Sequence, residues 1–306
     1  MQKKSTGLYN KTLHHAGKFY FSKQFFVVSF TIVNLPRMVY FMDNNILNDT
    51  LTGKLSGKED LIVSYSGGID STLLAVLAKK ELSGDVRCIL LDAPIVSRRA
   101  VREAVKTAEE LGLSCEVVPF PIMENEEFKK NPSNRCYYCK KYSARFLKKH
   151  AQKIGISHIA DGMNASDLQD YRPGFQASEE EGVLHPLLEA GLDKAQIRKI
   201  SRECDIPIWN KPSSACLSSR FPYGEEITVE KLEMVENAED FLQDLGFSQF
   251  RVRFHNRIAR IELISEELEK AMSFRERIVE ALEGYGFSYV TLDLKGFRSG
   301  SMNEVL

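Results

Sequence analysis

The sequence predicts an α/β protein with a doubly wound parallel sheet and a smaller C-terminal α+β domain. Between residues 60 and 204, short apolar runs alternate with stretches of helical periodicity, which is typical of βαβ units. After residue 224 the pattern changes to helix, strand, strand, helix and strand, which favours a sheet covered on one face. The chain of 306 residues is long enough for two domains, and we expect them at 45–224 and 225–306.

In the first domain, strands and helices are expected to alternate. Its strands are predicted at 61–65, 86–91, 115–120 and 158–161. Its helices are predicted at 71–81, 97–111, 133–153 and 193–204. In the second domain we predict helices at 228–245 and 265–285 and strands at 250–254, 258–263 and 289–294. A loop rich in serine and proline, 205–223, connects the two domains.

Residues 1–44 precede these elements and are expected to be a poorly ordered or wrongly started extension. Their apolar stretch, 25–33, is too short to cross a bilayer, and no small-x-small cleavage site follows it. A signal anchor is the alternative interpretation. Met38 and Met42 both precede a beginning of the kind found in cytosolic proteins.

Composition and charge are those of an ordinary soluble globular protein, with 43% hydrophobic and 27% charged residues. The formal net charge of -1 argues against a protein that binds nucleic acid along many phosphates. We therefore expect a small-molecule partner, no nucleic acid and no membrane. Six cysteines are sparse for a disulfide scaffold in a chain of this length, so we expect a reducing, cytoplasmic compartment.

A phosphate-binding loop is predicted between the first strand and the first helix, at Ser66, Gly67, Gly68, Ile69, Asp70, Ser71 and Thr72. Glycines allow successive backbone N–H groups to point at an anion, and the helix N-terminus adds partial positive charge. The three hydroxyl groups supply further donors. Asp70 fits beside phosphate only with a divalent cation between them, so we expect Mg²⁺. The alternative is an ordinary Gly-Gly turn capped by Asp and Ser.

Other acidic and glycine residues follow the second and fourth predicted strands. Asp92 closes the second strand, and Asp161 and Gly162 close the fourth. In a parallel sheet the carboxyl ends of the strands share one edge, where nucleotides bind. We therefore expect these residues to bind ATP, although ordinary turns are an equal alternative.

Three cysteines are candidates for iron ligands. Cys136 and Cys139 stand three residues apart near the start of a helix, and we expect both to ionise readily. With Cys216 they would bind three irons of a [4Fe-4S] cluster and leave one iron open, for example to hydrosulfide. Persulfide or disulfide chemistry, a zinc site with His185 as fourth ligand, and inert thiols remain alternatives. Cys88, Cys115 and Cys204 are expected to be core residues.

Arginines in the second domain are candidates for phosphate binding. Arg251 and Arg253 alternate along a predicted strand, which places both guanidinium groups on one face. Together with Ser219, Arg220 and Arg298 they would clamp a phosphate, a task that suits the planar guanidinium group. A solvated polar face is the alternative interpretation.

The phosphate loop resembles the PP-loop of N-type ATP pyrophosphatases, which cleave ATP between the α and β phosphates. The resemblance becomes more specific in the segments 170–174, 218–224, 251–256 and 296–300. These are similar to segments of LarE, a family of ATP-dependent sulfur transferases that build the nickel-pincer nucleotide cofactor of lactate racemase. The match runs from about residue 60 to nearly the last residue.

This resemblance implies an acceptor, pyridinium-3,5-biscarboxylic acid mononucleotide, whose carboxylate attacks the α-phosphorus of ATP and releases pyrophosphate. Sulfur then displaces AMP. The resemblance implies that the acceptor and its phosphate are bound by Arg172, Ser219, Arg220, Glu239, Arg251, Arg253, Glu262 and Arg298. It also implies a hexamer.

The source of the sulfur has two versions in this family. One class sacrifices a single cysteine and leaves dehydroalanine, whereas another binds an iron-sulfur cluster through three cysteines. This chain resembles the second class through Cys136, Cys139 and Cys216, and both Ala215 and Cys216 match the sacrificial position. Asp70 and Cys216 are therefore the expected catalytic residues. A PP-loop tRNA thiolase and a non-catalytic ATP-binding sulfur carrier are the rival functions.

Overall fold

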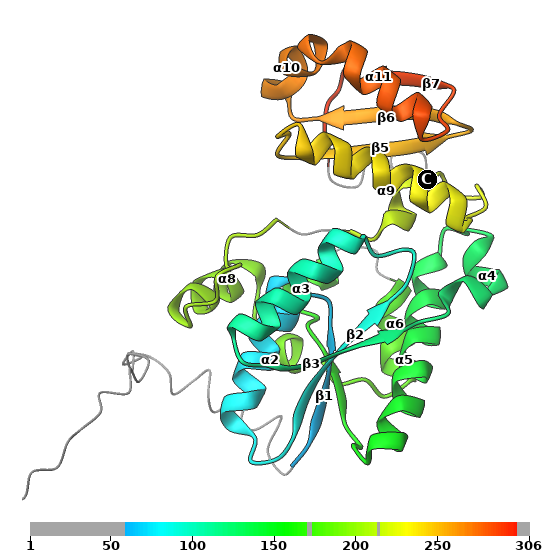
Figure 1. Ribbon diagram of the computed structural model, residues 1–306. Coiled ribbons are helices and arrows are strands. Elements are labelled where there is room, and N and C mark those ends of the chain that lie inside the picture. Colours follow the sequence, from blue (N-terminus) through cyan, green and yellow to red (C-terminus); the bar gives the residue numbers. More distant parts are fainter. Residues whose placement is uncertain (1–58, 170–172, 213–214, 299–306) are drawn as a thin grey trace, which may run out of the picture. The chain divides into compact units, whose positions relative to one another are not determined.

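The computed structural model describes residues 59–169, 173–212 and 215–298 (Figure 1). These residues form a four-stranded sheet, a three-stranded sheet and the helices around them. The predicted N-terminal extension and Arg172 lie outside the described residues. None of the helices in the described ranges is long and apolar enough to cross a membrane.

The four-stranded sheet is parallel and has the strand order β3-β2-β1-β4. Its strands are β1 (Leu61–Tyr65), β2 (Val86–Asp92), β3 (Ser114–Pro119) and β4 (Ile159–Asp161). The predicted strands match them to within one residue at each end. Because all four strands run in one direction, their carboxyl ends share one edge of the sheet, as the predicted nucleotide site requires.

Helices cover both faces of this sheet, which confirms the doubly wound class (Figure 1). The larger helices are α2 (Ile69–Glu81), α3 (Arg98–Glu110), α5 (Arg135–Ile154) and α8 (Lys194–Glu203). Strand β1 shows the division, because Leu61 and Val63 pack in the hydrophobic cluster that contains α2, α3 and α8 residues. Ile62 points the other way and packs with Leu147 of α5.

Several short helical elements had no counterpart in the sequence prediction. They are η1 (Ile122–Glu124), α4 (Glu126–Lys129), η2 (Ala165–Gln169), α6 (Pro173–Glu180), α7 (Pro186–Glu189) and η3 (Leu217–Arg220). The last of these lies inside the predicted loop 205–223. Elements of this length contain too few residues to show a helical period in the sequence.

The second sheet has the order β5-β6-β7, in which β5 and β6 are antiparallel and β6 and β7 are parallel. Its strands are β5 (Phe250–His255), β6 (Ile258–Leu263) and β7 (Tyr289–Leu292), and its helices are α9 (Val229–Asp244), α10 (Leu268–Ser273) and α11 (Arg275–Gly284). Val252 and Ile261 are buried with helix residues such as Leu232 and Leu282. The sheet is therefore covered by helices on one face, as predicted.

The prediction of one continuous helix at 265–285 was wrong. The segment begins with η4 (Ser265–Glu267) and then divides into α10 and α11 at Phe274. The Phe274 ring packs edge-on against Phe247, with 6.5 Å between ring centroids. The break lets the chain change direction while Ala271 and Ile278, on either side of it, both remain in the core.

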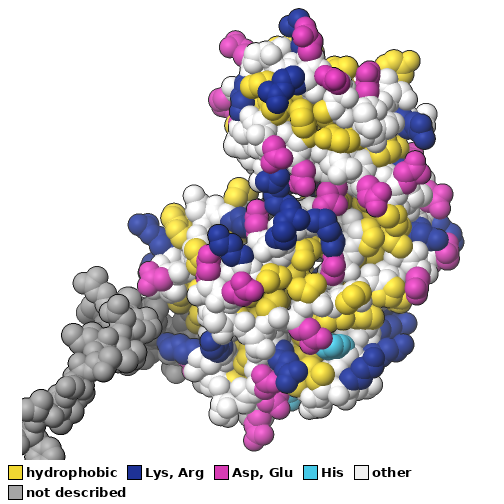
Figure 2. Space-filling model, viewed as in Figure 1, with side chains coloured by type: hydrophobic (Ala, Val, Ile, Leu, Met, Phe, Trp, Pro, Cys, Tyr) yellow, Lys and Arg dark blue, Asp and Glu magenta, His cyan; other side chains and the backbone are white. Residues whose placement is uncertain are grey.

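The predicted boundary between residues 224 and 225 stays a prediction. One hydrophobic cluster contains Ile95 and Phe128 from before this position and Phe254 from after it. Charged side chains add a second connection, because Arg99 of α3 contacts Asp244 at 2.7 Å and Asp240 at 3.1 Å on α9. Figure 2 shows Lys and Arg side chains lying beside Asp and Glu side chains in this region.

Candidate active site

The segment 66–72 runs from the end of β1 into the first turn of α2 and has the shape of an anion cradle. Gly67 adopts φ +68°, and a Cβ atom there would lie 2.3 Å from the Cβ of Ala104 in α3. Only glycine fits this position. Gly68 stands at the N-cap of α2 and offers no side chain to its first turn. The first N–H groups of a 13-residue helix therefore stay available to an anionic ligand.

Hydroxyl groups hold the shape of this loop. The Thr72 hydroxyl donates to the Gly68 carbonyl at 2.8 Å, and the Ser71 hydroxyl donates to the same oxygen at 3.2 Å. Ser66 Oγ lies 3.2 Å from Ser71 Oγ. Ser71 and Thr72 are buried, whereas Ser66 is exposed. The direct phosphate contacts predicted for these residues stay predictions.

Asp70 is held by two residues that sequence reasoning missed. One carboxylate oxygen lies 3.2 Å from the Lys194 ammonium, and the other accepts a hydrogen bond from the Asn164 amide at 3.3 Å. Lys194 is the first residue of α8, and a capping box between Asp193 and Gln196 fixes where that helix begins. The Asp-Lys-x-Gln pattern signalled a helix start, but nothing in the sequence connected it with Asp70.

The turn that follows β4 packs directly on the phosphate loop. A Cβ atom at Gly162 would lie 2.5 Å from the backbone nitrogen of Ser71 and 2.8 Å from the carbonyl carbon of Asp70. Glycine is therefore required by a close approach between two backbones. This contact brings the predicted residues at the ends of β1 and β4 together.

Asp161 is a buried carboxylate held between two basic side chains. It lies 2.7 Å from His185 Nδ1 and 3.1 Å from Lys140 Nζ, and it accepts from the Met163 amide at 3.2 Å. Burial by itself would raise the pKa of Asp161, but Lys140 and His185 outweigh burial and hold this pKa well below its usual range. Asp161 thus orients the turn that carries Gly162. Its direct contact with ATP stays a prediction.

Asp92 also lies at the carboxyl edge of the sheet, where it forms an ion pair with Arg98 near the start of α3. The backbone N–H of Arg98 donates to the Glu236 carboxylate of α9. Asp92 therefore lies at the predicted edge, and its role in ATP binding stays a prediction.

Cys136 and Cys139 lie one turn apart on α5, and Cys216 lies close enough to Cys139 to interact with it electrostatically. Cys136 and Cys216 are exposed, whereas Cys139 is half-buried. The pKa of Cys139 is raised to about 12, chiefly by burial and also by the neighbouring Cys216 and Cys136, while Lys140 and Arg135 act in the opposite direction. The prediction that both α5 cysteines ionise readily was therefore wrong for Cys139, because desolvation outweighs the helix N-terminus and the nearby cations.

No group of three His, Cys, Asp or Glu side chains within the described ranges is arranged to hold a metal ion. His185, considered as a fourth zinc ligand, uses Nδ1 for Asp161. Iron-sulfur clusters are held by cysteine sulfur, and the Cys139 thiol lies near those of Cys136 and Cys216. The other cysteines are core residues as predicted, since Cys88 is buried and Cys115 and Cys204 pack against the same hydrophobic cluster.

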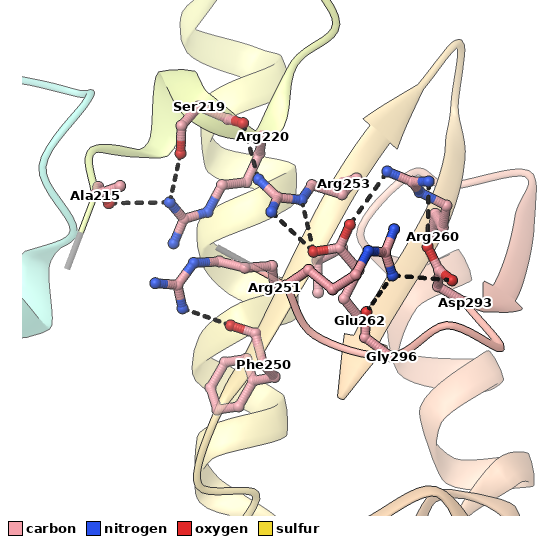
Figure 3. Close-up of polar contacts among 12 residues, drawn as sticks. Ala215, Ser219, Arg220, Phe250, Arg251, Arg253, Arg260, Glu262, Asp293 and Gly296 are labelled. Atoms are coloured by element: carbon pink, nitrogen blue, oxygen red, sulfur yellow. Dashed lines mark hydrogen bonds and ion pairs between the residues drawn. The ribbon is translucent and has the colours of Figure 1, made fainter. Parts of the chain in front are cut away.

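The uncovered face of the second sheet carries buried ion pairs (Figure 3). Arg253 donates to one oxygen of Glu262 at 2.8 and 3.1 Å and to the Ser219 carbonyl at 2.9 Å. Arg260 contacts the other Glu262 oxygen at 3.2 Å and Asp293 at 3.2 Å. Glu262 is fully buried and Arg253 is 5% exposed. The alternative of a solvated polar face is therefore wrong.

Arg220 forms a second buried pair beside the first. It donates to the two carboxylate oxygens of Glu239 at 2.9 and 2.8 Å, and it is 2% exposed. Its remaining nitrogen donates to the carbonyls of Ala215 and Cys216. The predicted phosphate clamp and the loop that bears Cys216 are thus tied together by one side chain.

Arg251 differs from its neighbours because it contacts no carboxylate in the described part of the chain. It donates to the Phe250 carbonyl at 2.6 Å and lies over the Phe297 ring at 5.1 Å. Burial and the charge of Arg220 lower the pKa of Arg251 to about 10. Arg298 donates to the Gly296 carbonyl and lies 3.7 Å from Asp293. An anion beside Arg251 would relieve the repulsion among these cations.

The parallel sheet has the order β3-β2-β1-β4, and its strand β1 leads through a Ser-Gly-Gly loop into a helix without a side-chain N-cap. This arrangement defines a PP-loop nucleotide-binding enzyme. In agreement, the NAD synthase family profile matches residues 44–236. Across most of its length, the chain is also similar to proteins of a narrower group. One of them is a pyridinium-3,5-bisthiocarboxylic acid mononucleotide synthase that aligns with 84% of this chain. The chain belongs to the LarE family of ATP-dependent sulfur transferases.

The family membership is supported by relatives that align over most of both chains. The chain is 38% identical over 258 residues to the pyridinium-3,5-bisthiocarboxylic acid mononucleotide synthase of Lactiplantibacillus plantarum, covering 84% of this chain and 94% of that protein. It is 43% identical over 248 residues to an uncharacterized protein of Synechocystis, covering 80% and 92%. A tRNA-specific 2-thiouridylase of Leptospira biflexa is 26% identical over 200 residues, 51% of each chain.

Proposed function

We propose that this chain adenylylates a carboxylate of pyridinium-3,5-biscarboxylic acid mononucleotide with ATP and then replaces AMP by sulfur. The observation that carries this proposal is the 38% identity to a pyridinium-3,5-bisthiocarboxylic acid mononucleotide synthase, which is covered over 94% of that protein's length. The anion cradle at 66–72 and the arginines of the second sheet also support the proposal. They supply the two phosphate-binding regions that such a reaction needs.

In the first step, a carboxylate oxygen of the acceptor attacks the α-phosphorus of ATP, and the bond to the β-phosphate breaks. The N–H groups at the start of α2 stabilise the charge that develops on the departing pyrophosphate. Asp70 would hold Mg²⁺, which supplies charge neutralisation at the phosphates. In the second step, sulfur adds to the activated carbonyl carbon, and AMP leaves with the oxygen that came from the acceptor.

On the acceptor side, Arg251 is the residue that would bind the phosphate of the mononucleotide. It carries positive charge without a carboxylate contact in the described ranges, and Arg220 and Arg253 lie beside it. Glu239 and Glu262 fix the positions of those two neighbours through buried ion pairs. Ser219, Arg298 and Arg172 complete the proposed set of acceptor ligands, of which Arg172 lies outside the described residues.

For the sulfur, Cys136, Cys139 and Cys216 are the proposed ligands of a [4Fe-4S] cluster, whose fourth iron would carry the sulfide that is transferred. The support is their soft donor chemistry and the nearness of Cys139 to both Cys136 and Cys216. Iron and sulfide analysis after anaerobic purification tests this proposal. Cys136→Ala should lose iron and multiple turnover, and a Cys216 that becomes dehydroalanine would favour sacrifice instead.

The ATP half of the proposal is tested with Asp70→Asn in an assay of pyrophosphate release with ATP, Mg²⁺ and the acceptor. We expect a loss of about 100-fold or more, because charge stabilisation at a transition state is worth that much. Asp85→Asn is the matched control, since Asp85 is exposed and lies before β2, away from the carboxyl edge. Normal release by folded Asp70→Asn would refute the loop's role.

The partial similarity to a tRNA thiouridylase makes tRNA the second candidate acceptor. Pyrophosphate release that depends on bulk tRNA and not on the mononucleotide would favour that candidate. The near-neutral charge of the chain favours the small acceptor. We also propose a cytoplasmic hexamer with domains at 45–224 and 225–306, for which light scattering of the purified chain tests the number of subunits.

A further inference from the structure

A buried arginine and asparagine connect the helix that carries Cys136 and Cys139 to the segment that follows Cys216. Arg135 is the first residue of α5 and is 6% exposed. Its Nη1 donates to the Asn131 side-chain oxygen at 2.6 Å. Its guanidinium carbon also lies 4.9 Å from the centroid of the Tyr223 ring. A buried arginine so close to two of the candidate cysteines requires a structural reason.

Asn131 continues this connection across the chain. It is fully buried and adopts φ +53°, a left-handed conformation that asparagine tolerates better than most residues. Its side-chain nitrogen donates to the Pro222 carbonyl at 2.7 Å, and its own carbonyl accepts from Gly224 N–H at 2.8 Å. The segment 222–224 is therefore fixed to the start of α5 by side-chain and backbone hydrogen bonds.

The same segment is anchored at its other end, beside Cys216. Leu217 N–H donates to the Ile95 carbonyl at 2.9 Å, and the Leu217 side chain is buried. Phe221 is fully buried in the same hydrophobic cluster. With both ends held, the segment 216–224 has little freedom to move Cys216 toward or away from α5.

We propose that Asn131 and Arg135, with Tyr223, form a brace that sets the position of Cys216 relative to Cys136 and Cys139. The inference rests on the proposed function, because it gives these three thiols a shared task. Asn131, Arg135 and Tyr223 are positioning residues in this proposal and make no contact with substrate. The brace explains how thiols separated by about 80 residues of sequence are kept within reach of one another.

The test measures how close the thiols are held in the metal-free protein. Glutathione disulfide is added anaerobically, so that the Cys216 thiolate forms a mixed disulfide and releases one glutathione thiolate. A cysteine of α5 then attacks the Cys216 sulfur, forms the protein disulfide and releases the second glutathione. Mass spectrometry of peptides gives the ratio of protein disulfide to mixed disulfide at Cys216. This ratio depends on proximity and alignment rather than on the reactivity of Cys216.

Arg135→Lys keeps the positive charge but loses the planar guanidinium group that contacts Asn131 and Tyr223. Tyr223→Leu removes the aromatic ring beside Arg135. We expect each to lower the ratio by about tenfold or more, because effective concentration falls steeply when two groups are misplaced. Lys153→Gln is the matched control, since Lys153 is exposed near the far end of α5, and it should keep the wild-type ratio. Iron bound per chain after anaerobic reconstitution should fall in the same two variants.

The brace would be overturned if the wild-type chain gave no peptide in which Cys216 is linked to a cysteine of α5. It would also be overturned if both variants had the circular dichroism spectrum and the disulfide ratio of the wild type. If Arg135→Lys does not fold, Tyr223→Leu decides. Pyrophosphate release measured on the wild-type preparation keeps this test separate from the proposed function. If the wild type releases pyrophosphate but the variants leave the disulfide ratio unchanged, the brace alone is rejected. If the variants lower the ratio but the wild type releases no pyrophosphate, the proposed function alone is rejected.

Discussion

Single buried charges decide much of the second sheet's stability. Glu262 is fully buried and neutralises both Arg253 and Arg260. Glu262→Gln keeps the shape but removes the carboxylate that Arg253 and Arg260 share, whereas Arg260 keeps its contact with Asp293. Removing one member of a buried ion pair costs about 3 to 5 kcal/mol. We expect a loss of that size in the free energy of unfolding, measured by urea denaturation.

Asp244→Asn is the control for this change, because Asp244 is 69% exposed in its pair with Arg99. An exposed pair contributes about 0 to 1 kcal/mol, so this variant should remain close to the wild type. Equal losses in the two variants would contradict the idea that burial makes the Glu262 pairs important.

The low pKa of Asp161 makes stability depend on pH in a definite direction. A carboxyl whose folded pKa is depressed stabilises the fold above its unfolded pKa, near about 4, and loses that contribution as the pH falls through the folded value. The difference in unfolding free energy between wild type and Asp161→Asn should therefore shrink as the pH is lowered from about 6 toward about 2. Urea denaturation at a series of pH values measures this difference, and a constant difference would argue against the Asp161 ion pairs.

At the scale of elements, the junction of β1 and α2 depends on the fit of Gly67 against α3. Gly67→Ala would combine a left-handed backbone with a Cβ atom 2.3 Å from Ala104, whereas Gly155→Ala, at φ +78°, meets no atom within 4 Å. We expect Gly155→Ala to cost about 1 kcal/mol from backbone strain. Gly67→Ala should cost about 1 to 3 kcal/mol more from overpacking and should weaken ATP binding. Thermal unfolding and ATP titration of both variants measure this contrast.

The longer elements could be predicted because their apolar residues repeat with one period over many positions. Strand β1 was predictable for another reason, since Leu61, Ile62 and Val63 form a short continuous apolar run of the kind found in strands that are buried on both faces. The break at Phe274 could not be predicted, because both sides of it are helical and the contact of Phe274 with Phe247 depends on the fold.

The candidate site was predictable where one short segment carries the signal, as in the loop around Asp70. The residues that contact Asp70 could not be predicted, because Lys194 and Asn164 are distant in sequence and the fold brings them to it. The ionisation of Cys139 was mispredicted for a related reason. Sequence spacing places it near a helix N-terminus, but burial of its sulfur depends on side chains from distant segments.

At the scale of the whole molecule, the two sheets should unfold together. A single hydrophobic cluster contains Phe120 and Phe128 beside the parallel sheet and Val252 and Phe254 of the second sheet, so the second sheet has no complete core without residues of the first part of the chain. The one tryptophan, Trp209, packs against the cluster of the parallel sheet and reports on that part. Urea unfolding followed by Trp209 fluorescence and by far-ultraviolet circular dichroism should give coincident curves. Two separated transitions would show that the sheets are independent.

The ion pair between Asp70 and Lys194 joins residues 124 positions apart. During synthesis on the ribosome, the loop around Asp70 emerges long before its partner does. A nascent chain that ends ahead of α8 therefore has the glycines and hydroxyls of the loop but not the cation that steadies its carboxylate. Completion of the nucleotide site is a late event in the making of this protein, and truncated products should lack it.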